Sequence, residues 1–341
     1  MRRLLLLGGG HAHALVLLEF RRFISRNLEV VLVSPGPVHG YSGMVPGVIA
    51  GHYALSEAQI DLARLARNAG AQLVTERVLR IDAAARRVEL ANGGTLAWDL
   101  LSLNLGSVPE GAGPPAIAVK PFDEFIARWR ALLDEGRAAP RIAVVGGGAG
   151  GVELAMAMKF ALARRGGGVV ELFSDRFLFK PAIAARIRNA LGRLSVPLHV
   201  GEAAGDGFDA VFWVTGAAAL PLLAASGLAT DGRGFVCVDA SLRSVSHPDV
   251  FAAGDTASIE GRAVPKSGVY AVRQGEVLAA NLQNAVRGLP MRDYQPQVES
   301  LALISCGERY AIASRGRWSA EGRWAWRWKD WLDRRWISKF S

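Results

Sequence analysis

The sequence is poor in cysteine, and Cys237 and Cys306 are the only two in 341 residues. They are too few and too far apart for a disulfide framework, and no His/Cys spacing typical of a metal site is present. No apolar stretch approaches the roughly 20 residues that a membrane-spanning helix needs. The first strand is expected to begin near residue 3, which leaves no room for a secretory signal. These absences predict a cytoplasmic protein without a bound metal.

What the sequence does contain is ordinary for an α/β protein with two or three domains, except for its charge. Half of the residues are hydrophobic, 21% are charged, and the net charge is +9. Eight Lys and Arg residues lie between Arg315 and Ser341 against three acidic ones, so this segment carries over half of the excess. Such an asymmetry indicates contact with an acidic surface, and we expect a membrane rather than nucleic acid.

Two glycine-rich turns carry most of the functional information. The first reads Gly8-Gly9-Gly10-His11-Ala12-His13, and the second reads Gly146-Gly147-Gly148-Ala149-Gly150-Gly151. Each follows a short apolar run and leads into a helical pattern, the context in which glycines let the backbone approach a pyrophosphate. Two such turns in one chain predict two dinucleotides, one passing electrons to the other.

The two turns differ in detail. The second is an intact G-x-G-x-x-G, whereas the first has His13 where the third glycine belongs. Since that glycine permits close packing of helix on strand, we expect His13 to push the helix outward or to swing toward the ligand. The acidic residue expected about 20 positions after the first turn is replaced by Ser34.

After the second turn, Ser174 and Asp175 are followed by Arg176. An acid at this place favours NADH and an arginine favours NADPH, so both nucleotides remain open.

Hydrophobic periodicity gives the order of the elements. We expect a strand at 3–8, a helix at 10–26, a strand at 29–34, a site-lining loop at 35–52 and a helix at 56–69. A hairpin should close at Asn92-Gly93. The second unit begins at residue 141, with later strands at 169–174 and 210–214. A strand at 250–255 and a helix at 268–287 return to the first unit.

The predicted fold is therefore α/β, with two Rossmann-like domains, the second inserted in the first. The first domain comprises residues 1–115 and 235–300, and the second comprises residues 116–234. Residues 301–341 form a C-terminal α/β segment.

This order of motifs resembles the pyridine nucleotide-disulfide oxidoreductases, flavoproteins that bind two dinucleotides. The resemblance covers nearly the whole chain and rests on the two turns and on Val250-Phe251-Ala252-Ala253-Gly254-Asp255. Within the family, the chain resembles the type II NADH:quinone oxidoreductase branch and its relatives fused ahead of selenide, water dikinase. The cues for those relatives are Gly-Gly-Gly-His-Ala-His, the segment 41–47, the segment 305–316 and Trp328-Lys329-Asp330-Trp331-Leu332-Asp333.

The resemblance implies FAD at the first turn and NADH or NADPH at the second. It assigns Gly8, Gly10 and His11 to the FAD pyrophosphate, Ser34 to its ribose, Pro46 to the ring and Asp255 to the ribityl chain. It places Glu153 beside the nicotinamide. The remaining cofactor-binding positions that it implies are Ala12, Val78, Gly106, Gly146, Gly148, Gly151, Gly216 and Gly254.

The chain also departs from this family. Disulfide reductases relay electrons through a cysteine pair in the first domain, and residues 35–60 contain no cysteine. Val269 and Arg273 stand where type II enzymes carry glutamines at the quinone site. The electron acceptor is therefore left open between a quinone and other compounds.

In addition to Glu153, Lys266 and His11 are candidate catalytic residues. A cation at Lys266 would stabilise the anionic reduced flavin, although a surface lysine with a packed stem is an equal alternative. His11 and His13 could exchange protons with flavin N5 or the acceptor, or they could be packing histidines. Cys306 is expected to be a small buried residue.

The segment 323–340 predicts an amphipathic helix. Trp324, Trp328, Trp331, Leu332 and Trp336 share one face, with arginine and lysine at its flanks. This composition favours the lipid headgroup interface, and the alternatives are docking on the protein's own core or on a twin subunit in a homodimer.

We therefore predict a FAD-dependent NAD(P)H dehydrogenase at the inner face of the membrane, which passes electrons to an acceptor such as a quinone. The alternatives are a soluble reductase of a selenium or sulfur compound and a non-enzymatic flavin-binding redox sensor or scaffold.

Overall fold

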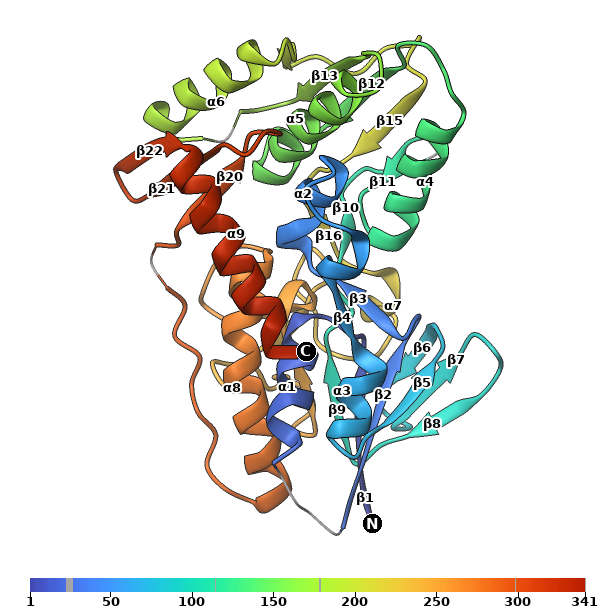
Figure 1. The fold of residues 1–341 in the computed structure, drawn as a ribbon. Helices are drawn as coiled ribbons and strands as arrows, with labels where there is room; N and C mark the ends of the chain where they lie inside the picture. The colour runs from blue at the N-terminus through green and yellow to red at the C-terminus, as the bar shows by residue number, and fades with distance from the viewer. Residues whose placement is uncertain (23–26, 114, 178, 298, 341) are drawn as a thin grey trace.

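The computed structural model describes residues 1–22, 27–113, 115–177, 179–297 and 299–340, and its core consists of two five-stranded parallel sheets (Figure 1). The first sheet has the order β18-β9-β1-β2-β5. Its strands are β1 (Arg2–Leu7), β2 (Leu28–Ser34), β5 (Gln72–Thr75), β9 (Leu100–Leu103) and β18 (Val250–Ala252). The second sheet has the order β11-β15-β12-β13-β14. Its strands are β11 (Ile117–Ala118), β12 (Arg141–Val145), β13 (Val169–Ser174), β14 (Leu198–Val200) and β15 (Ala210–Trp213).

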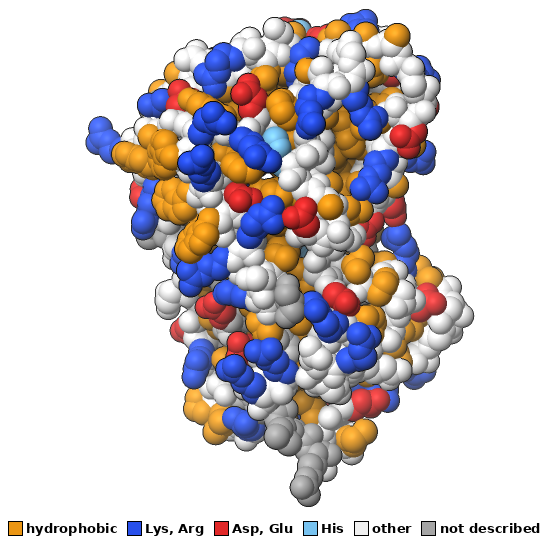
Figure 2. Space-filling view, in the orientation of Figure 1, with side chains coloured by type: hydrophobic (Ala, Val, Ile, Leu, Met, Phe, Trp, Pro, Cys, Tyr) orange, Lys and Arg blue, Asp and Glu red, His pale blue; other side chains and the backbone are white. Residues whose placement is uncertain are grey.

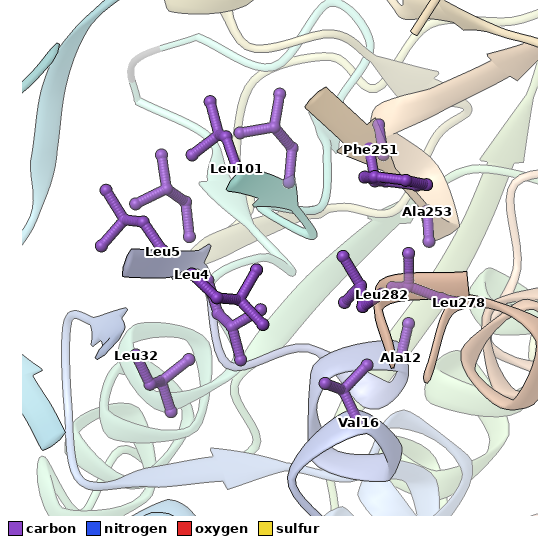
Figure 3. Close-up of a cluster of buried hydrophobic side chains, with 14 of the residues drawn as sticks. Leu4, Leu5, Ala12, Val16, Leu32, Leu101, Phe251, Ala253, Leu278 and Leu282 are labelled. Carbon is purple, nitrogen blue, oxygen red and sulfur yellow. The ribbon is translucent and has the colours of Figure 1, made fainter. Parts of the chain in front are cut away.

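The first sheet is covered on both faces, which explains the run of four leucines in β1. Leu4, Leu5, Leu6 and Leu7 are fully buried, as expected for the central strand of a parallel sheet. Figure 3 shows leucines of the strands and Phe251 of β18 close to Ala12 and Val16 of α1 (His11–Phe20) and to Leu278 and Leu282 of α8 (Gly268–Arg287).

The two helices α1 and α8 lie side by side and contact each other along their length (Figure 1). The predicted helix at 10–26 is shorter in the structure, because α1 ends at Phe20 and residues 21–22 form a turn. Residues 23–26 lie outside the described residues. The predicted helix at 268–287 matches α8.

A small antiparallel sheet, β6-β7-β8, packs on the first sheet through Ile81, Val88 and Leu90. Its strands are β6 (Val78–Asp82), β7 (Arg87–Leu90) and β8 (Thr95–Ala97). The hairpin between β7 and β8 contains Asn92-Gly93, which confirms that turn prediction.

Between β2 and β5 the chain forms more regular structure than the predicted loop and helix. This region contains β3 (Val38–Gly40), a 3-10 helix (Ser42–Met44), α2 (Val45–Ile49), a second 3-10 helix (Leu55–Ala58), β4 (Gln59–Asp61) and α3 (Leu62–Asn68). The expected helix at 56–69 is thus only its second half, because β4 pairs with β3 and takes up residues 59–61.

The chain leaves the first sheet after β9, builds the second sheet, and returns to the first sheet with β18. This agrees with the predicted insertion of one unit in the other, while the boundaries at 115, 234 and 300 stay predictions. The second sheet is covered by α4 (Phe122–Asp134), α5 (Ala149–Ala163) and α6 (Pro181–Arg193). Two short strands, β10 (Val108–Pro109) and β16 (Ala217–Ala218), pair with each other where the chain passes between the two units. Three further short elements contribute to the core of the first unit: α7 (Pro221–Ala224), β17 (Val236–Val238) and β19 (Ala257–Ile259).

The C-terminal segment is an antiparallel sheet crossed by one helix. Strands β20 (Ala302–Ser305), β21 (Ala311–Arg315) and β22 (Trp318–Gly322) precede α9 (Arg323–Ile337) and a 3-10 helix (Ser338–Phe340). Ala325, Asp333 and Trp336 of α9 are buried. Trp336 therefore faces the protein and not the exposed tryptophan face on which it was predicted. Among the described residues, no helix has both the length and the apolar character needed to cross a bilayer.

Candidate active site

Three loops meet at the carboxyl edge of the first sheet. Because β1, β9 and β18 are parallel neighbours, the segments that follow them, 8–10, 104–107 and 253–255, leave the sheet at the same edge. This is the edge where open α/β sheets bind their ligands. Gly8 must be a glycine, since its φ is +91° and a Cβ would overlap the backbone of Asn104.

Two buried amide side chains hold these loops together. Asn104 accepts a hydrogen bond from the Ala12 N–H (3.2 Å) and donates one to the Ala253 carbonyl (2.9 Å). Gln274 of α8 accepts one from the Gly254 N–H (2.6 Å). The first glycine turn is thereby tied to the Gly254-Asp255 segment, so both present their backbone to the same space.

That space is a cleft of about 840 Å³ that extends from the first turn to the start of α4. Its walls come from five segments. They are residues 8–11, 33–42, 76–79, 104–108 and 120–124, to which Asp255 and the beginning of α8 add further lining.

An ion pair crosses this cleft. Lys120 Nζ lies 2.7 Å from Asp255 Oδ2 and 3.2 Å from Ser107 Oγ, and Ser107 Oγ donates to the same carboxylate at 2.8 Å. Burial alone would raise the pKa of Asp255, but the charge of Lys120 and these hydrogen bonds override it and hold that pKa below its ordinary value. Asp255 is thus an ionised acceptor at the end of β18.

Two histidines beside the first turn are neutral. Burial lowers the pKa of His11 to about 3 and that of His39 to about 4, with His39 and Lys120 adding to the effect on His11. Their ring centres are 5.2 Å apart in an edge-to-face arrangement, and the ring centre of Tyr41 lies 5.4 Å from that of His11. Within the described residues, Nε2 of His11 and Nε2 of His39 are buried without a hydrogen-bond partner.

The second turn has the same relation to the second sheet. It links β12 to α5, and Gly151 packs so tightly that a Cβ would overlap the Gly146 carbonyl oxygen. At the end of β13, Ser174 Oγ accepts from the Gly147 N–H (2.9 Å) and donates to the Arg176 carbonyl (2.8 Å). Ser174 therefore supports the turn, and the side chains of Asp175 and Arg176 next to it are exposed.

Glu153, just after the first turn of α5, faces the C-terminal segment. It accepts a hydrogen bond from the Ser305 N–H at 2.8 Å. Burial raises the pKa of Glu153 to about 7 despite the opposing charge of Lys329. Burial would lower the pKa of Lys329, but Glu153 and Asp333 together raise it.

Lys329 connects α9 to the segment after β3. Its Nζ lies 2.8 Å from Asp333 Oδ2 and donates to the Gly43 carbonyl at 2.6 Å, while the Tyr41 hydroxyl donates to Asp333 Oδ1 at 3.1 Å. Burial, followed by the charge of Asp333, raises the pKa of Tyr41, so the phenol keeps its proton. The ring that packs on His11 is thereby anchored by the C-terminal helix.

Comparison with known proteins agrees with this architecture. The family model described as pyridine nucleotide-disulphide oxidoreductase matches residues 2–275. The chain belongs to this family. It is therefore an NAD(P)H oxidoreductase whose family cofactors are FAD and a pyridine nucleotide.

Individual relatives of this oxidoreductase share less of its sequence. An NADH dehydrogenase-like protein of Mycobacterium tuberculosis is 27% identical over an alignment of 300 residues that covers 76% of this chain and 73% of that one. The nitric oxide reductase FlRd-NAD(+) reductase of Citrobacter koseri is 33% identical over 160 residues, 40% of this chain and 41% of that enzyme. In that second case the match spans less than half of the relative.

Two solved structures show the same fold. The sulfide:quinone oxidoreductase of Aquifex aeolicus superposes with a TM-score of 0.81 and 17% identity, covering 100% of this chain and 91% of that one. The NADH:rubredoxin oxidoreductase of Clostridium acetobutylicum superposes with a TM-score of 0.72 and 18% identity, covering 92% of this chain and 81% of that one.

The first cleft of this oxidoreductase fits FAD. The N-cap of α1 is Gly10, which has no side chain to cap the helix, and in the described structure Asn104 takes up the Ala12 N–H, so the other N–H groups of the first turn are available to a phosphate. The unpartnered Nε2 of His11, a residue only 8% exposed, offers a further polar group at the cleft wall. The predicted FAD residues that line the cleft are Gly8, Gly10, His11, Ser34, Val78, Gly106 and Asp255.

Other predicted residues lie elsewhere. Ala12 and Gly254 contribute backbone groups to the hydrogen bonds described above. Pro46 lies on α2 and does not line the cleft. Lys266 lies behind Asp255, where its Nζ is 3.9 Å from the centre of the Phe235 ring and donates to the Ala257 carbonyl. Burial lowers its pKa to about 8.

The predicted pyridine-nucleotide residues Gly146, Gly148 and Gly151 form the second turn. Gly216 follows β15, where its carbonyl accepts from the Glu110 N–H at 2.7 Å. Glu153, two residues after Gly151 on α5, faces the C-terminal segment through its contact with Ser305. Their roles, like those of His11 and Lys266, stay predictions.

Sequence reasoning missed Lys120, His39 and Asn104. Asn104 directly follows β9, and a polar residue at the end of a central parallel strand is a signal that could have found it. Lys120 and His39 enter the cleft from segments with no motif. No group of three or more His, Cys, Asp or Glu side chains that could hold a metal occurs in the part of the chain that the structure describes.

Proposed function

We propose that this oxidoreductase transfers electrons from NAD(P)H to a quinone at the inner face of a membrane, on which the helix α9 lies. FAD held at the first turn would supply the redox chemistry between the nicotinamide and the acceptor. The protein binds both dinucleotides at its two glycine turns and orients them.

The observation that carries this proposal is an exposed row of tryptophans. Trp318, Trp324, Trp328 and Trp331 are 48%, 46%, 37% and 52% exposed, and we call them the tryptophan ridge. Trp324 contacts Trp318 and Trp328 with ring centres 6.3 Å apart in each case. Figure 2 shows hydrophobic side chains gathered over β22 and α9 among lysine and arginine. Tryptophan with flanking cations is typical of the headgroup region of a bilayer.

The opposite face of α9 supports the proposal. It carries Lys329 and Asp333, whose side chains are 13% and 9% exposed and contact Gly43 and Tyr41. One helix therefore joins the tryptophan ridge to the segment beside the first turn. A membrane-dissolved acceptor would approach the flavin from this side.

Glu153 and His11 have different uses in this proposal. With a pKa of about 7, Glu153 can hold or release a proton at its carboxylate near neutral pH. His11 is neutral and offers a hydrogen bond through Nε2. Lys266 places positive charge behind Asp255 and not in the cleft.

The first test is anaerobic mixing of the FAD-loaded protein with NADH and, separately, NADPH while absorbance near 450 nm is followed. Fast bleaching by either nucleotide is expected and identifies the donor. A flavin that neither nucleotide reduces would contradict the dehydrogenase and favour the redox-sensor alternative.

The second test compares the wild type with the triple variant Trp324→Ser/Trp328→Ser/Trp331→Ser in flotation with vesicles of phosphatidylglycerol and phosphatidylcholine. We expect the variant to lose vesicle binding and lipid-stimulated quinone reduction, while bleaching by the nucleotide is unchanged. The matched control is Val245→Ser/Leu289→Ser, since these residues are 42% and 47% exposed away from α9.

Three outcomes would overturn the membrane and quinone assignment. One is equal flotation of wild type and triple variant, and another is a change of oligomeric mass in the variant, which would make the ridge a homodimer contact. The third is faster turnover with a soluble sulfur or selenium compound than with any quinone.

A further inference from the structure

The position of the third fingerprint glycine holds different residues in the two turns: His13 in the first and Gly151 in the second. Gly151 stands five residues after Gly146, and α5 approaches the Gly146 carbonyl too closely for any Cβ. His13 stands five residues after Gly8 at the first turn. Because His13 has a Cβ, α1 cannot approach the Gly8 carbonyl in the same way.

The His13 side chain occupies this position through two hydrogen bonds. It is completely buried, with Nδ1 2.6 Å from the Gly8 carbonyl oxygen and Nε2 2.8 Å from Ser102 Oγ. A carbonyl oxygen can only accept, so Nδ1 carries the hydrogen, and Nε2 accepts from the Ser102 hydroxyl. Among the predicted alternatives for His13, the structure agrees with a packing histidine and not with a swing toward the ligand, because the ring is bonded to Gly8 and to Ser102 of the sheet.

These two bonds join the parts of the protein that form the cleft. Gly8 begins the phosphate-facing turn, and its N–H is bonded to the Val33 carbonyl at 2.8 Å. Ser102 lies on β9, two residues before Asn104, and pairs in register with Leu6. The imidazole thus connects the turn and α1 to the strand that leads into the 104–107 loop.

We propose that His13 is a positioning residue of the FAD site, which holds the Gly8 carbonyl and the start of α1 in place of the missing third glycine. The imidazole stays neutral, with its proton on Nδ1. Histidine at this position carries a constraint that glycine does not, because only the tautomer with its hydrogen on Nδ1 satisfies both hydrogen bonds. The inference rests on FAD binding in this cleft and is independent of the electron acceptor.

The test uses graded variants and the dissociation constant of FAD, measured by titrating the apoprotein. His13→Ala loses both bonds, and we expect at least about tenfold weaker binding, the effect of one to two buried hydrogen bonds. His13→Asn can still donate to Gly8, and Ser102→Ala leaves that bond intact. Both should stay within about threefold of the wild type. His247→Ala, which changes a partly exposed histidine outside the cleft, is the control and should bind FAD normally.

Two readouts separate positioning from general loss of structure. Visible circular dichroism of the bound flavin should change in His13→Ala and not in Ser102→Ala. Nitrogen-15 spectra of the wild-type histidines should show one neutral ring protonated at Nδ1 from pH 8 to pH 5.

The proposal fails if His13→Ala binds FAD with wild-type affinity and dichroism. It also fails if the His13 ring, identified by the signal that is lost in His13→Asn, carries its proton on Nε2. Should His13→Ala not fold, His13→Asn and His13→Leu decide: equal FAD affinity of these two would overturn the proposal, since only asparagine retains the donor.

Discussion

The two glycine turns differ in how the following helix contacts the carbonyl of the first glycine. At the second turn, Gly151 removes the side chain so that α5 can touch the Gly146 carbonyl. At the first turn, His13 keeps its side chain and bonds to the equivalent carbonyl of Gly8 at 2.6 Å. We infer that a missing glycine in a fingerprint does not imply a missing site where the residue in its place bonds to the same carbonyl.

The largest effect is expected where a side chain has no space. Gly151→Ala should reduce bleaching of the flavin by NAD(P)H at least about 100-fold, because α5 must move away from the turn. FAD content should stay normal. Gly192→Ala on α6 is the control, since a Cβ there meets nothing within 4 Å. Normal nucleotide kinetics in Gly151→Ala would show that the two turns do not differ in this way.

Lowering the pH should reduce the contribution of the first turn to protein stability more than that of the second. The pKa of His13 is about 4 in the folded protein because of burial, against 6.5 as its ordinary value. The unfolded chain therefore binds a proton that the folded protein does not, and stability falls as pH drops from about 6.5 toward 4. His13 contributes on the order of 1.4 kcal/mol per pH unit in this window.

The measurement is urea unfolding of the apoprotein between pH 7 and pH 4.5, with His13→Asn beside the wild type. The variant should show a shallower loss of unfolding free energy, because it lacks the titrating group. Parallel curves for the two proteins would contradict a depressed pKa at His13.

The next effect concerns the ion pair in the first cleft. Lys120→Met leaves Asp255 buried without its cation, and we expect apoprotein stability to fall by about 2 kcal/mol, less than for a fully enclosed pair because Lys120 is partly exposed. Arg77→Met is the matched control, since Arg77 and Glu124 are 59% and 63% exposed and such a pair contributes under about 1 kcal/mol. Equal losses of unfolding free energy in Lys120→Met and Arg77→Met would mean that burial does not determine how much an ion pair contributes to stability.

The smallest effect should appear at Glu153 of the second unit. Below pH 7 its carboxyl is protonated, and glutamine is a close substitute; above pH 7 the wild type carries a charge that glutamine lacks. Glu153→Gln should match wild-type flavin bleaching at pH 6 and differ severalfold at pH 8. The same pH profile in both proteins would remove Glu153 from the reaction.

The sequence predicted several of the parallel strands and the helix α8 well, because their signals are local. The run before Gly8, the strand at 169–174 and the helix at 268–287 each need only a few neighbouring residues to be recognised. Region 35–52 was predicted as an open loop, since its prolines and glycines conceal the pairing of β3 with β4.

The candidate site was predicted only where a backbone motif marks it. Lys120 and Asp255 are 135 positions apart, and no motif near either residue predicts their contact. For His13 the sequence left three interpretations open, and it could not select the packing histidine because Ser102, its partner, lies 89 positions away. For the same reason Trp336 was placed with the exposed tryptophans, although it packs on Tyr41.

The contact between Tyr41 and Asp333 has a consequence for biosynthesis. These residues are 292 positions apart, and Lys329 reaches Gly43 over a similar separation. On the ribosome, the segment beside the first turn is made early but cannot adopt its final environment until α9 has emerged. The contacts that anchor Tyr41 and Gly43 therefore form only after translation has passed residue 333, and a nascent chain that stops earlier lacks them.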